Sequence, residues 1–584
     1  MIAEKKWILS RESASEKTQE LASGLDIPPV LANLLTQRGI DSLEAAKRFF
    51  NPLLEELHDP FLMKDMDRAV IRVREAIERG EKVMVYGDYD VDGTTAVALI
   101  YTFLSSIGAK NLLFYIPDRY TEGYGISSRG IDYAASQNVN LIIALDCGIK
   151  AIDRVDYAAS MGIDFIICDH HLPGDEIPRA VAVLDPRRTD CGYPFKELSG
   201  CGVGYKLSEA YARRYNIDKS LVESLLDYVA VSIASDIVPL TGENRILAYY
   251  GLERLNSNPS KGLGSIIKIC GLEKHRITID EIVFKIGPRI NAAGRMVSES
   301  EDGSVISGGG NAVRLLISTT EEKALKYGNI IDTCNTDRKE IDRTITSEAR
   351  RIVESTPGYE TSKCTVIYNP EWIKGVVGIV ASRLIESYYR PTVVLTMSNG
   401  FITGSARSVP GFDLYQAIES CSDLMENFGG HTYAAGMTMK PENLDEFKRR
   451  FEAYVEEHID PEMLIPQIEI DSYLSLDEIT PRFRQILSRF QPFGPGNPAP
   501  TFRTDSVNDY GHGRRVGGSL EHLKMDIVGG GSTSPISAIA FSQARHASHI
   551  LDGGSFDICY SVVENSYRGE VKPQLRIKDI KQRK

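Results

Sequence analysis

Three apolar runs that end in acidic or imidazole side chains decide the predicted fold. They are Val83-Met-Val-Tyr-Gly-Asp-Tyr-Asp-Val-Asp92, Leu141-Ile-Ile-Ala-Leu-Asp146 and Phe165-Ile-Ile-Cys-Asp-His-His171. The apolar runs alternate with helix-like segments such as Thr94–Ile107 and Ala151–Met161, which is typical of a doubly wound, mostly parallel α/β sheet. Because the carboxyl ends of parallel strands share one edge of a sheet, we expect these polar side chains to converge there.

The side chains at the strand ends predict a divalent metal site. Carboxylates that meet at close range repel one another and become protonated unless cations neutralise them. Aspartate and histidine without cysteine favour Mn²⁺ or Mg²⁺ over structural zinc. A single aspartate at a strand end more often caps the next helix, a role that suits Asp169 and Asp185. For the whole set we predict two ions that share a carboxylate, an arrangement that promotes phosphoryl displacement, with the ligands Asp90, Asp92, Asp146, His170 and Asp236.

The remaining sequence divides into further predicted regions. Helical periodicity dominates residues 1–80 and returns over residues 241–355, where Pro288–Gly310 is rich in turn-forming residues. A second, smaller α/β domain is expected over residues 356–460. Residues 461–584 hold short alternating runs between Gly, Pro and Ser, the pattern of a small β-barrel. We therefore expect an α/β protein whose metal site lies in a parallel-sheet domain over residues 81–240.

Composition is that of an ordinary folded protein. The chain has 584 residues, of which 42% are hydrophobic and 25% charged, and its net charge of −13 argues against indiscriminate binding to polyanions but not against a local basic groove. Nine cysteines without a C-x-x-C spacing favour reduced thiols over disulfides or a zinc site. Met1–Trp7 lacks the pattern of a signal peptide and no apolar run is long enough to span a membrane, so we expect a cytoplasmic protein without membrane contact.

Several motifs resemble those of the DHH phosphoesterases in order and spacing. The four motifs of that family correspond to Gly87-Asp-Tyr-Asp-Val-Asp-Gly-Thr-Thr95, Asp146-Cys-Gly148, Asp169-His-His171 and Ser235-Asp236. Gly404-Ser-Ala-Arg-Ser408 and Gly429-Gly-His431 resemble the associated DHHA1 domain. Pro288-Arg-Ile-Asn-Ala-Ala-Gly-Arg295 and Pro492-Phe-Gly-Pro-Gly-Asn-Pro498 are similar to segments of the RecJ family, bacterial 5′→3′ exonucleases specific for single-stranded DNA.

The resemblance implies roles for the residues of the acidic cluster. It implies that the five predicted ligands and His171 are catalytic, that Asp146 bridges the two ions, and that Asp88 and His171 lie beside the metals or act as alternate ligands. Many DHH proteins have a histidine where this chain has Tyr86, four residues before the first ligand acid, although RecJ-type sequences commonly lack that histidine too. The resemblance also implies that the C-terminal barrel is an OB-fold that binds nucleic acid.

Small-residue loops and cations supply candidate contacts to a substrate phosphate. Backbone N–H groups, hydroxyls and cations near glycine can bind a phosphate closely, although each such motif alone is more often a tight turn, and each cation alone can equally form a structural salt bridge. By resemblance, some of these residues would hold the DNA end across a cleft from the metals, which would select a free 5′ end. The candidates are Ser405, Arg407, Gly430 and His431, with Arg119, Arg289 and Asn291 as further ones.

The resemblance implies a metal-dependent exonuclease that degrades single-stranded DNA 5′→3′ to mononucleotides in DNA repair and recombination. Single-strand-binding protein and a helicase are the implied partners, and the lack of a Walker A pattern argues against ATP-driven unwinding by this chain. Two alternatives stay open. One is a DHH hydrolase of short oligonucleotides, cyclic dinucleotides or pyrophosphate, and the other is a non-catalytic DNA-binding scaffold.

Overall fold

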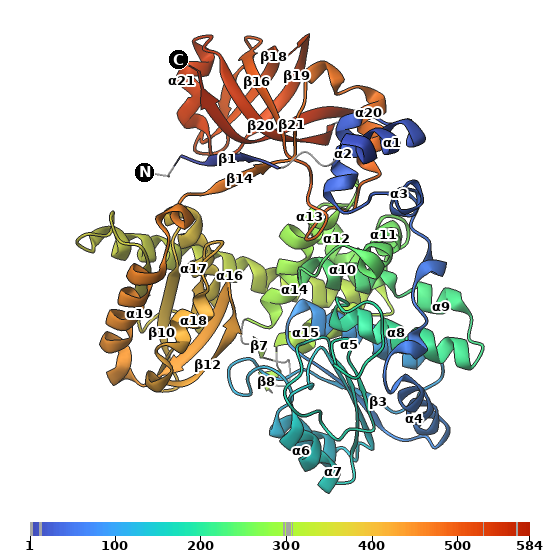
Figure 1. Ribbon diagram of the computed structural model, residues 1–584. Coiled ribbons are helices and arrows are strands. Elements are labelled where there is room, and N and C mark those ends of the chain that lie inside the picture. The colour runs from blue at the N-terminus through green and yellow to red at the C-terminus, as the bar shows by residue number, and fades with distance from the viewer. Residues whose placement is uncertain are drawn as a thin grey trace. The chain divides into compact units, whose positions relative to one another are not determined.

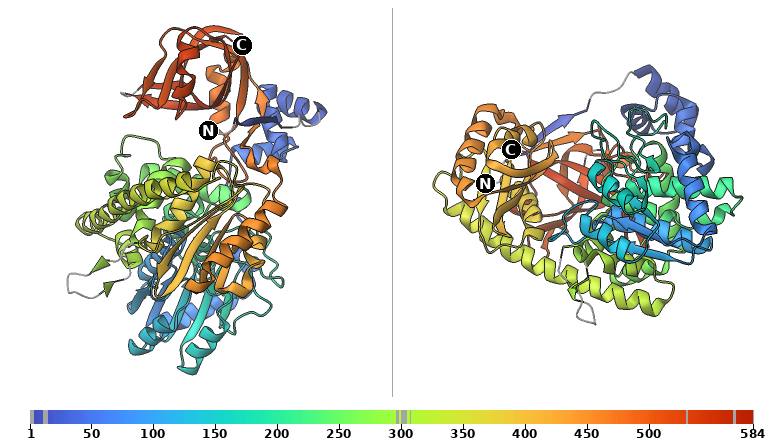
Figure 2. Two further views of the ribbon diagram at one scale, coloured as in Figure 1. Left: turned by 90° about the vertical axis from the view of Figure 1, so that its left-hand side faces the viewer. Right: turned by 90° about the horizontal axis from the view of Figure 1, so that it is seen from below.

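The computed structural model describes residues 4–10, 15–295, 298–299, 305–306, 308–529, 531–567 and 570–583 (Figure 1). Contacts divide the described chain into two compact units. The smaller unit holds residues 4–9 and 334–469, and the larger unit holds residues 10–333 and 470–583. Helix α16 (Glu321–Ser355), the long yellow-green helix of Figure 2, is 35 residues long and contributes residues to both units.

A five-stranded parallel sheet forms the centre of the larger unit. Its spatial order is β3-β2-β4-β5-β6, and every neighbouring pair is parallel. The strands are β2 (Val83–Gly87), β3 (Leu112–Tyr115), β4 (Leu141–Leu145), β5 (Asp164–Cys168) and β6 (Ala182–Leu184). The strand order reverses beside β2, because the chain adds β3 on one side of β2 and β4 on the other. A doubly wound sheet has its ligand crevice at the carboxyl ends of the strands flanking such a reversal.

Helices cover both faces of this sheet, as the alternation of side chains along the strands requires. Val83 and Val85 of β2 face a core shared with α4 (Met66–Glu78), α5 (Val91–Ser106) and α8 (Gly200–Arg214). Met84 and Tyr86 face the opposite core, with α6 (Ser128–Ser136) and α7 (Ile152–Ser160) (Figure 1). The predicted doubly wound α/β architecture is confirmed.

Most other elements of the larger unit are helices. They are α1 (Ser15–Leu25), α2 (Pro29–Gln37), α3 (Leu43–Phe50), α9 (Lys219–Glu223), α10 (Leu226–Ser235), α11 (Gly242–Ser257), α12 (Lys261–Ile269), α13 (Ile279–Glu281), α14 (Gly287–Ala293) and α15 (Gly308–Leu316). A π-helix over Ile282–Ile286 joins α13 to α14, and β7 (Ser298–Glu299) pairs with β8 (Val305–Ile306).

Two local features differ from the expectation. The stretch Pro288–Gly310 was expected to be turn-rich, but its first six residues are helical in α14 and its last three begin α15, while residues 296–297, 300–304 and 307 lie outside the described part of the chain. Pro288 lies directly after the π-helix over Ile282–Ile286, whose wider turn accommodates a residue without a backbone N–H. Helices α1 to α4 agree with the helical periodicity of residues 1–80, but the sequence analysis missed strand β1 (Lys6–Leu9), which pairs with β14 (Gln467–Ile470).

The smaller unit is a second α/β layer structure. Its sheet has the order β12-β13-β11-β10-β9, in which only β9 and β10 are parallel. The strands are β9 (Thr365–Tyr368), β10 (Thr392–Ser398), β11 (Phe401–Arg407), β12 (Met425–His431) and β13 (Ala434–Met439). Apolar residues of α16 and α17 (Lys374–Tyr388) pack on one face, and those of α18 (Leu414–Glu419) and α19 (Leu444–His458) pack on the other.

The C-terminal region is a closed five-stranded barrel. Its strands pair in the order β16-β20-β21-β19-β18, and a further pairing of β16 with β18 closes the ring (Figure 2). The elements are β15 (Ser472–Tyr473), β16 (Phe502–Asp509), β17 (Arg514–Val516), β18 (His522–Gly529), β19 (Ser532–Ala540), β20 (Phe556–Tyr567) and β21 (Glu570–Gln582), with helices α20 (Pro481–Ser488) and α21 (Ala547–Leu551). The predicted β-barrel is confirmed, and its core includes apolar residues of α1, α2 and α3.

Two predictions from composition can be compared with the structure. All nine cysteines are unpaired, as the sequence predicts for reduced thiols. None of the described helices combines the length and the apolar character that crossing a bilayer requires.

Candidate metal centre and phosphate-binding residues

The predicted ligands meet at the carboxyl edge of the parallel sheet. Asp92 lies in the first turn of α5, after β2, and Asp146 directly follows β4. His170 follows β5, and Asp236 ends α10, which packs against α5. The site therefore straddles the reversal of strand order beside β2, where a doubly wound sheet has its crevice.

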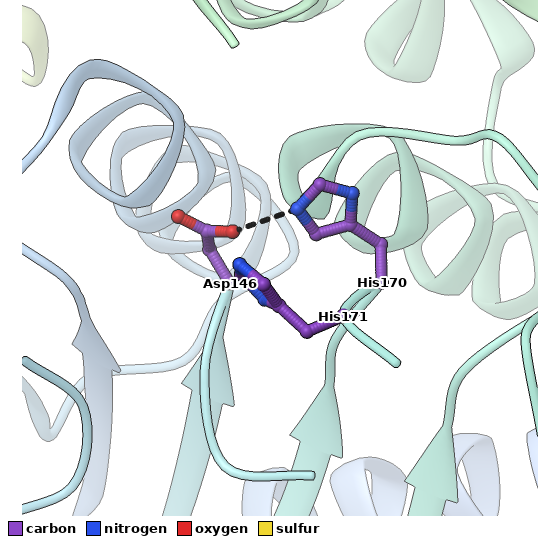
Figure 3. A group of neighbouring side chains, drawn as sticks. All are labelled: Asp146, His170 and His171. Carbon is purple, nitrogen blue, oxygen red and sulfur yellow. Dashed lines mark ion pairs between the residues drawn. The ribbon is translucent and has the colours of Figure 1, made fainter. Parts of the chain in front are cut away.

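His170 is the centre of the cluster. Its Nε2 lies 3.2 Å from Asp146 Oδ1, 3.6 Å from Asp236 Oδ2 and 3.7 Å from Asp92 Oδ2. Figure 3 shows the His170 ring directed at the Asp146 carboxylate, with His171 beside them. Two groups of side chains bring one ligand atom each close enough to share a metal ion, namely Asp92 with His170 and Asp236, and Asp146 with His170 and His171.

The Asp92 carboxylate is fixed by the protein before any ligand binds. Its Oδ2 accepts from the backbone N–H of Gly200 at 2.7 Å, and its Oδ1 accepts from the N–H of Cys201 at 2.8 Å and from Ser232 Oγ at 2.7 Å. Gly200 and Cys201 begin α8, so the carboxylate also lies at the positive end of that helix dipole. The arrangement holds the Asp92 carboxylate in one orientation.

Asp146 has a strained backbone at the point where it enters the site. Its φ of 58° lies in the left-handed region, which is uncommon for a residue other than glycine and recurs at functional sites. A Cβ on Gly200 would lie 2.6 Å from Asp146 Cβ, so only glycine at position 200 allows this close approach. The Tyr124 hydroxyl donates to the Asp146 carbonyl oxygen at 2.8 Å and thus helps to hold the turn.

Electrostatics of the cluster favour a cation at its centre. Burial and then the charge of Asp92 raise the pKa of Asp146 well above its ordinary range, and the same two causes raise the pKa of Asp236 to about 8. Burial lowers the pKa of His170, which leaves its imidazole neutral. Asp146 Oδ1 and His170 Nε2 are buried but form no hydrogen bond within the described residues. Buried, unpartnered carboxylate and imidazole atoms fit the ligand set of a divalent cation.

His171 has a different environment from His170. Its Nδ1 lies 2.8 Å from Asp169 Oδ1, and its Nε2 lies 3.2 Å from the Tyr124 hydroxyl. Burial lowers the pKa of His171, but the hydrogen bond to Asp169 outweighs burial and raises that pKa to about 9. The paired carboxylate of Asp169 also accepts from the N–H of Ile149 and so joins two loops of the site. It does not cap a helix, the alternative considered for it.

Asp88 and Asp90 belong to the wall of the site and are absent from the two close ligand groups found among the described residues. Asp90 is the N-cap of α5, and its Oδ1 accepts from the Gly93 N–H at 2.9 Å. Burial and the charge of Asp92 raise the pKa of Asp90. Asp88 is buried, with Oδ1 at 3.3 Å from the Gly125 N–H, while its Oδ2 has no hydrogen-bond partner among the described residues. Asp90 thus caps the N-terminus of α5 and also lies near Asp92, one of the predicted metal ligands.

The three further phosphate candidates of the larger unit have different surroundings. The Arg119 guanidinium lies over the Tyr89 ring at 4.8 Å from its centroid; burial raises the pKa of nearby Asp88 well above its ordinary range, and the charge of Arg119 partly opposes that rise. Arg289 is engaged in an ion pair with Asp332 at 2.8 Å and donates to the Lys285 carbonyl. Asn291 Oδ1 is buried without a hydrogen-bond partner among the described residues.

The phosphate candidates of the smaller unit lie at adjoining strands of its sheet. On β11, Arg407 Nη1 donates to Ser405 Oγ at 2.8 Å, and burial lowers the pKa of Arg407. On β12, Gly430 has a φ of 151° and His431 is exposed. Strand β13 pairs with both β11 and β12, opposite Arg407 on one side and His431 on the other. The sheet thus places a half-buried guanidinium, a hydroxyl and an imidazole on neighbouring strands.

The Pro492–Pro498 loop packs against the segment that follows Asp236. The Leu240 N–H donates to the Pro495 carbonyl at 2.6 Å, and a Cβ on Gly494 would lie 2.5 Å from Leu240 Cδ1. Asn497 holds the loop, since its Nδ2 donates to the carbonyl oxygens of Phe490 and Pro492 at 2.8 Å each. The loop therefore packs against Leu240, four residues after Asp236.

The residues that fix Asp92 were missed in the sequence. Ser232 lies within the apolar run of α10, and its hydroxyl also contacts Ser199 Oγ at 2.6 Å. Ser199 is the N-cap of α8, with its hydroxyl accepting from the Gly202 N–H. The stretch Ser199-Gly-Cys-Gly202, a capping residue before small residues, could have indicated a helix N-terminus open to an anion.

Comparison with protein families identifies the class to which this fold and site belong. Residues 82–233 match the N-terminal domain of the DHH family, residues 361–457 match the DHHA1 domain, and residues 470–579 match the RecJ OB domain. The parallel sheet with its acidic edge is thus that of a DHH protein, and the second α/β unit is its DHHA1 partner.

Individual relatives define the family more narrowly. A Bacillus subtilis protein named single-stranded-DNA-specific exonuclease RecJ is 35% identical over 99% of this chain and 71% of its own length. The Escherichia coli protein of the same name is 32% identical, with 99% of each chain covered. The crystal structure of Thermus thermophilus RecJ in complex with Mn²⁺ matches with a TM-score of 0.82 at 25% identity, covering 99% of this chain and 80% of that one. The chain belongs to the RecJ family.

Proposed function

We propose that this protein is a metal-dependent exonuclease that degrades single-stranded DNA. The observation that carries the proposal is the convergence of Asp92, Asp146, His170 and Asp236 within one buried cluster of a chain that matches RecJ proteins over nearly its whole length. The DHHA1 and OB domains support a polymeric nucleic-acid substrate over a small phosphate ester.

We propose that Asp90, Asp92, Asp146, His170 and Asp236 hold two Mn²⁺ or Mg²⁺ ions, with Asp88 as a further candidate. Bound divalent ions would supply an activated water and charge stabilisation for phosphodiester hydrolysis. The protein's part is to hold the ligands in place, through the α8 N-terminus on Asp92 and the strained turn at Asp146. His171, which Asp169 orients, is placed to contact a phosphate oxygen at the mouth of the cluster.

We assign the contacts to the DNA end to Ser405, Arg407, Gly430 and His431, with Arg119, Arg289 and Asn291 as further candidates. Arg407 supports this assignment because it is half-buried without a carboxylate partner among the described residues, and an anion would offset its desolvation. Arg289 is the weakest member, since Asp332 already neutralises its charge. Recognition of a terminal phosphate would favour the 5′→3′ direction and release of mononucleotides.

The broader biology is also a proposal. We assign the protein to DNA repair and recombination in the cytoplasm, with single-strand-binding protein and a separate helicase as partners. We propose a five-part division of the chain, with a helical N-terminal region over residues 1–80, a DHH domain over 81–240, a helical connector over 241–355, a DHHA1 domain over 356–460 and an OB domain over 461–584. The family models that match within three of these ranges support it.

The test is digestion of a 5′-phosphorylated single-stranded oligonucleotide that is labelled separately at each end. With Mn²⁺ or Mg²⁺, the 5′ label should leave early as a mononucleotide while the 3′-labelled strand shortens step by step. EDTA or the Asp146→Ala variant should abolish both. Rapid hydrolysis of dinucleotides or cyclic dinucleotides with an intact long strand would instead indicate a small-phosphate hydrolase, and metal-independent binding without cleavage would indicate a scaffold.

A further inference from the structure

An arginine-rich groove lies between α16 and α17 in the smaller unit. It has a volume of about 670 Å³ and is lined by Arg343, Arg350 and Arg351 of α16 and by Arg383 of α17, together with two hydroxyl side chains and the carboxylate of Glu354. We call these four arginines and their surroundings the arginine groove. No part of the proposed metal centre or of the Ser405–Arg407 site contributes to its lining.

Helical periodicity explains why the arginines share one side of α16. Arg350 and Arg351 lie seven and eight residues after Arg343, which is about two turns of helix. The three side chains therefore lie on the same side of α16. Ile345, Ala349 and Val353 occupy the opposite face and pack in the core with α17 and β10. The apolar face of α16 packs in the core, and the arginine groove lies on the solvent-facing side of the same helix.

The charges of the groove are only partly neutralised. Arg383 forms a two-pronged contact with the buried carboxylate of Asp342, with its Nη2 at 2.7 Å from Asp342 Oδ2 and its Nε at 2.9 Å from Oδ1. Arg350 Nη2 donates to Ser387 Oγ at 2.9 Å. Arg343 and Arg351 are exposed, and neither forms an ion pair within the described part of the chain. Glu354 is the one carboxylate in the lining, and its Oε1 accepts from the Tyr388 hydroxyl.

This excess of cations is unusual for the molecule. The chain carries 80 acidic against 67 basic residues, and several other exposed arginines pair with a nearby acid. On α19 of the same unit, Arg449 contacts Glu446 at 2.6 Å and Arg450 contacts Asp423 at 2.9 Å. Four guanidiniums that line one groove with a single carboxylate make it a candidate site for an anion.

We propose that the arginine groove binds the phosphate backbone of single-stranded DNA, as a second contact besides the catalytic site. Guanidinium groups match phosphate oxygens with two parallel hydrogen bonds, and hydroxyl groups add further donors. The lining contains neither apolar nor aromatic side chains. An acidic peptide would be recognised through apolar anchors as well as charge, whereas a phosphate backbone needs charge and hydrogen bonds alone. The inference rests on the proposed function, since it takes single-stranded DNA as the substrate.

The test measures how DNA affinity depends on salt. The full-length chain carries Asp146→Asn so that a fluorescent oligo(dT) strand stays intact, Mg²⁺ is present, and binding is followed by anisotropy between about 50 and 300 mM salt. For single strands the slope of log K against log salt is roughly 0.7 for each phosphate contact. Arg343→Ala with Arg351→Ala should therefore reduce the slope by about 1.4 and weaken binding roughly three- to tenfold at low salt. Lysine at both positions should keep the slope.

A matched control removes the same charge elsewhere in the smaller unit. Arg449→Ala with Arg450→Ala deletes two arginines that already have acidic partners, and it should leave the slope unchanged. Equal slopes for the groove variant and the parent, or an equal fall in the control, would overturn the proposal. Poly-glutamate serves as a second probe of binding. If the groove variant loses poly-glutamate binding while the salt slope for DNA stays unchanged, the proposal is overturned in favour of an acidic peptide. Failure of the parent chain to bind the strand would instead contradict the proposed function.

Discussion

The metal centre of the larger unit and the arginine groove of the smaller unit use charge in opposite ways. In the metal centre, buried carboxylates raise one another's pKa values and are held by backbone N–H groups and a helix N-terminus. In the groove, exposed guanidiniums extend from a helix whose other face is packed in a core. A buried, preorganised site should give large effects that resist salt, whereas an exposed one should give small effects that salt screens.

The largest expected effect is on catalysis when Asp146 loses its charge. Asp146→Asn keeps the size of the side chain but removes the ligand whose Oδ1 lies nearest His170 Nε2, so we expect the cleavage rate to fall about a thousandfold or more. The loss should be the same at 50 and 300 mM salt, because the site is buried. Asp132→Asn, an exposed acid that accepts from the Tyr157 hydroxyl, is the control and should retain full activity. A small or salt-dependent loss would place the chemistry elsewhere.

Metal affinity should depend steeply on pH. The pKa of Asp236 is raised to about 8, so below pH 8 this carboxyl holds a proton that metal binding must release. We expect Mn²⁺ affinity to rise by up to tenfold per pH unit below this pKa, hence roughly fiftyfold from pH 6 to pH 8, in titration calorimetry. Calorimetry in buffers of different ionisation enthalpy should detect the released proton. An affinity that is equal at pH 6 and pH 8 would contradict this electrostatic description.

The same shift has a definite sign for stability without metal. A carboxyl whose folded-state pKa lies above its unfolded value keeps more protons in the folded state, so its contribution to stability declines as pH rises from about 4 to 8. The unfolding midpoint of the metal-free wild type should therefore fall relative to Asp236→Asn over that range. Mn²⁺ should raise the wild-type midpoint more at pH 8 than at pH 6.

Removal of the Arg407 guanidinium should affect substrates according to their 5′ end. Arg407 is half-buried, and its Nη1 donates to Ser405 Oγ, so a terminal phosphate there would receive a charge-assisted hydrogen bond. For Arg407→Ala we expect kcat/KM to fall roughly tenfold to a hundredfold on a 5′-phosphorylated strand and much less on a 5′-hydroxyl strand. Arg449→Ala serves as the control on the same unit. Equal losses on both strands would exclude a role in recognising the terminal phosphate.

A smaller effect is expected from a residue that only positions a ligand. Ser232→Ala removes one of three hydrogen bonds to Asp92 and should weaken Mn²⁺ binding about tenfold. Ser208→Ala is a matched control, since that buried hydroxyl donates to the Gly204 carbonyl and does not touch the cluster. If both serine variants bind Mn²⁺ as the wild type does, the hydrogen bonds to Asp92 contribute no preorganisation.

The sequence predicted the elements whose position follows from strand direction. Asp92, Asp146 and His170 follow buried parallel strands, and such strands bring their carboxyl ends together whatever the loop lengths are. The support of Asp92 by Gly200, Cys201 and Ser232 could not be predicted, because it depends on how α8 and α10 pack. The strand β1 was missed for a similar reason, since its partner β14 lies more than 450 residues away. The arginine groove likewise needs α17 beside α16, although the arginine spacing on α16 was visible.

The most direct test of the central claim is to locate the metal. Crystals grown with Mn²⁺ should show anomalous scattering peaks among Asp92, Asp146, His170 and Asp236, with Asp146 shared if two ions bind, and the Asp146→Asn variant should lose at least one peak. Wild-type crystals that contain Mn²⁺ only outside this cluster, from a preparation that still degrades single-stranded DNA, would contradict the assignment of catalysis to the sheet edge.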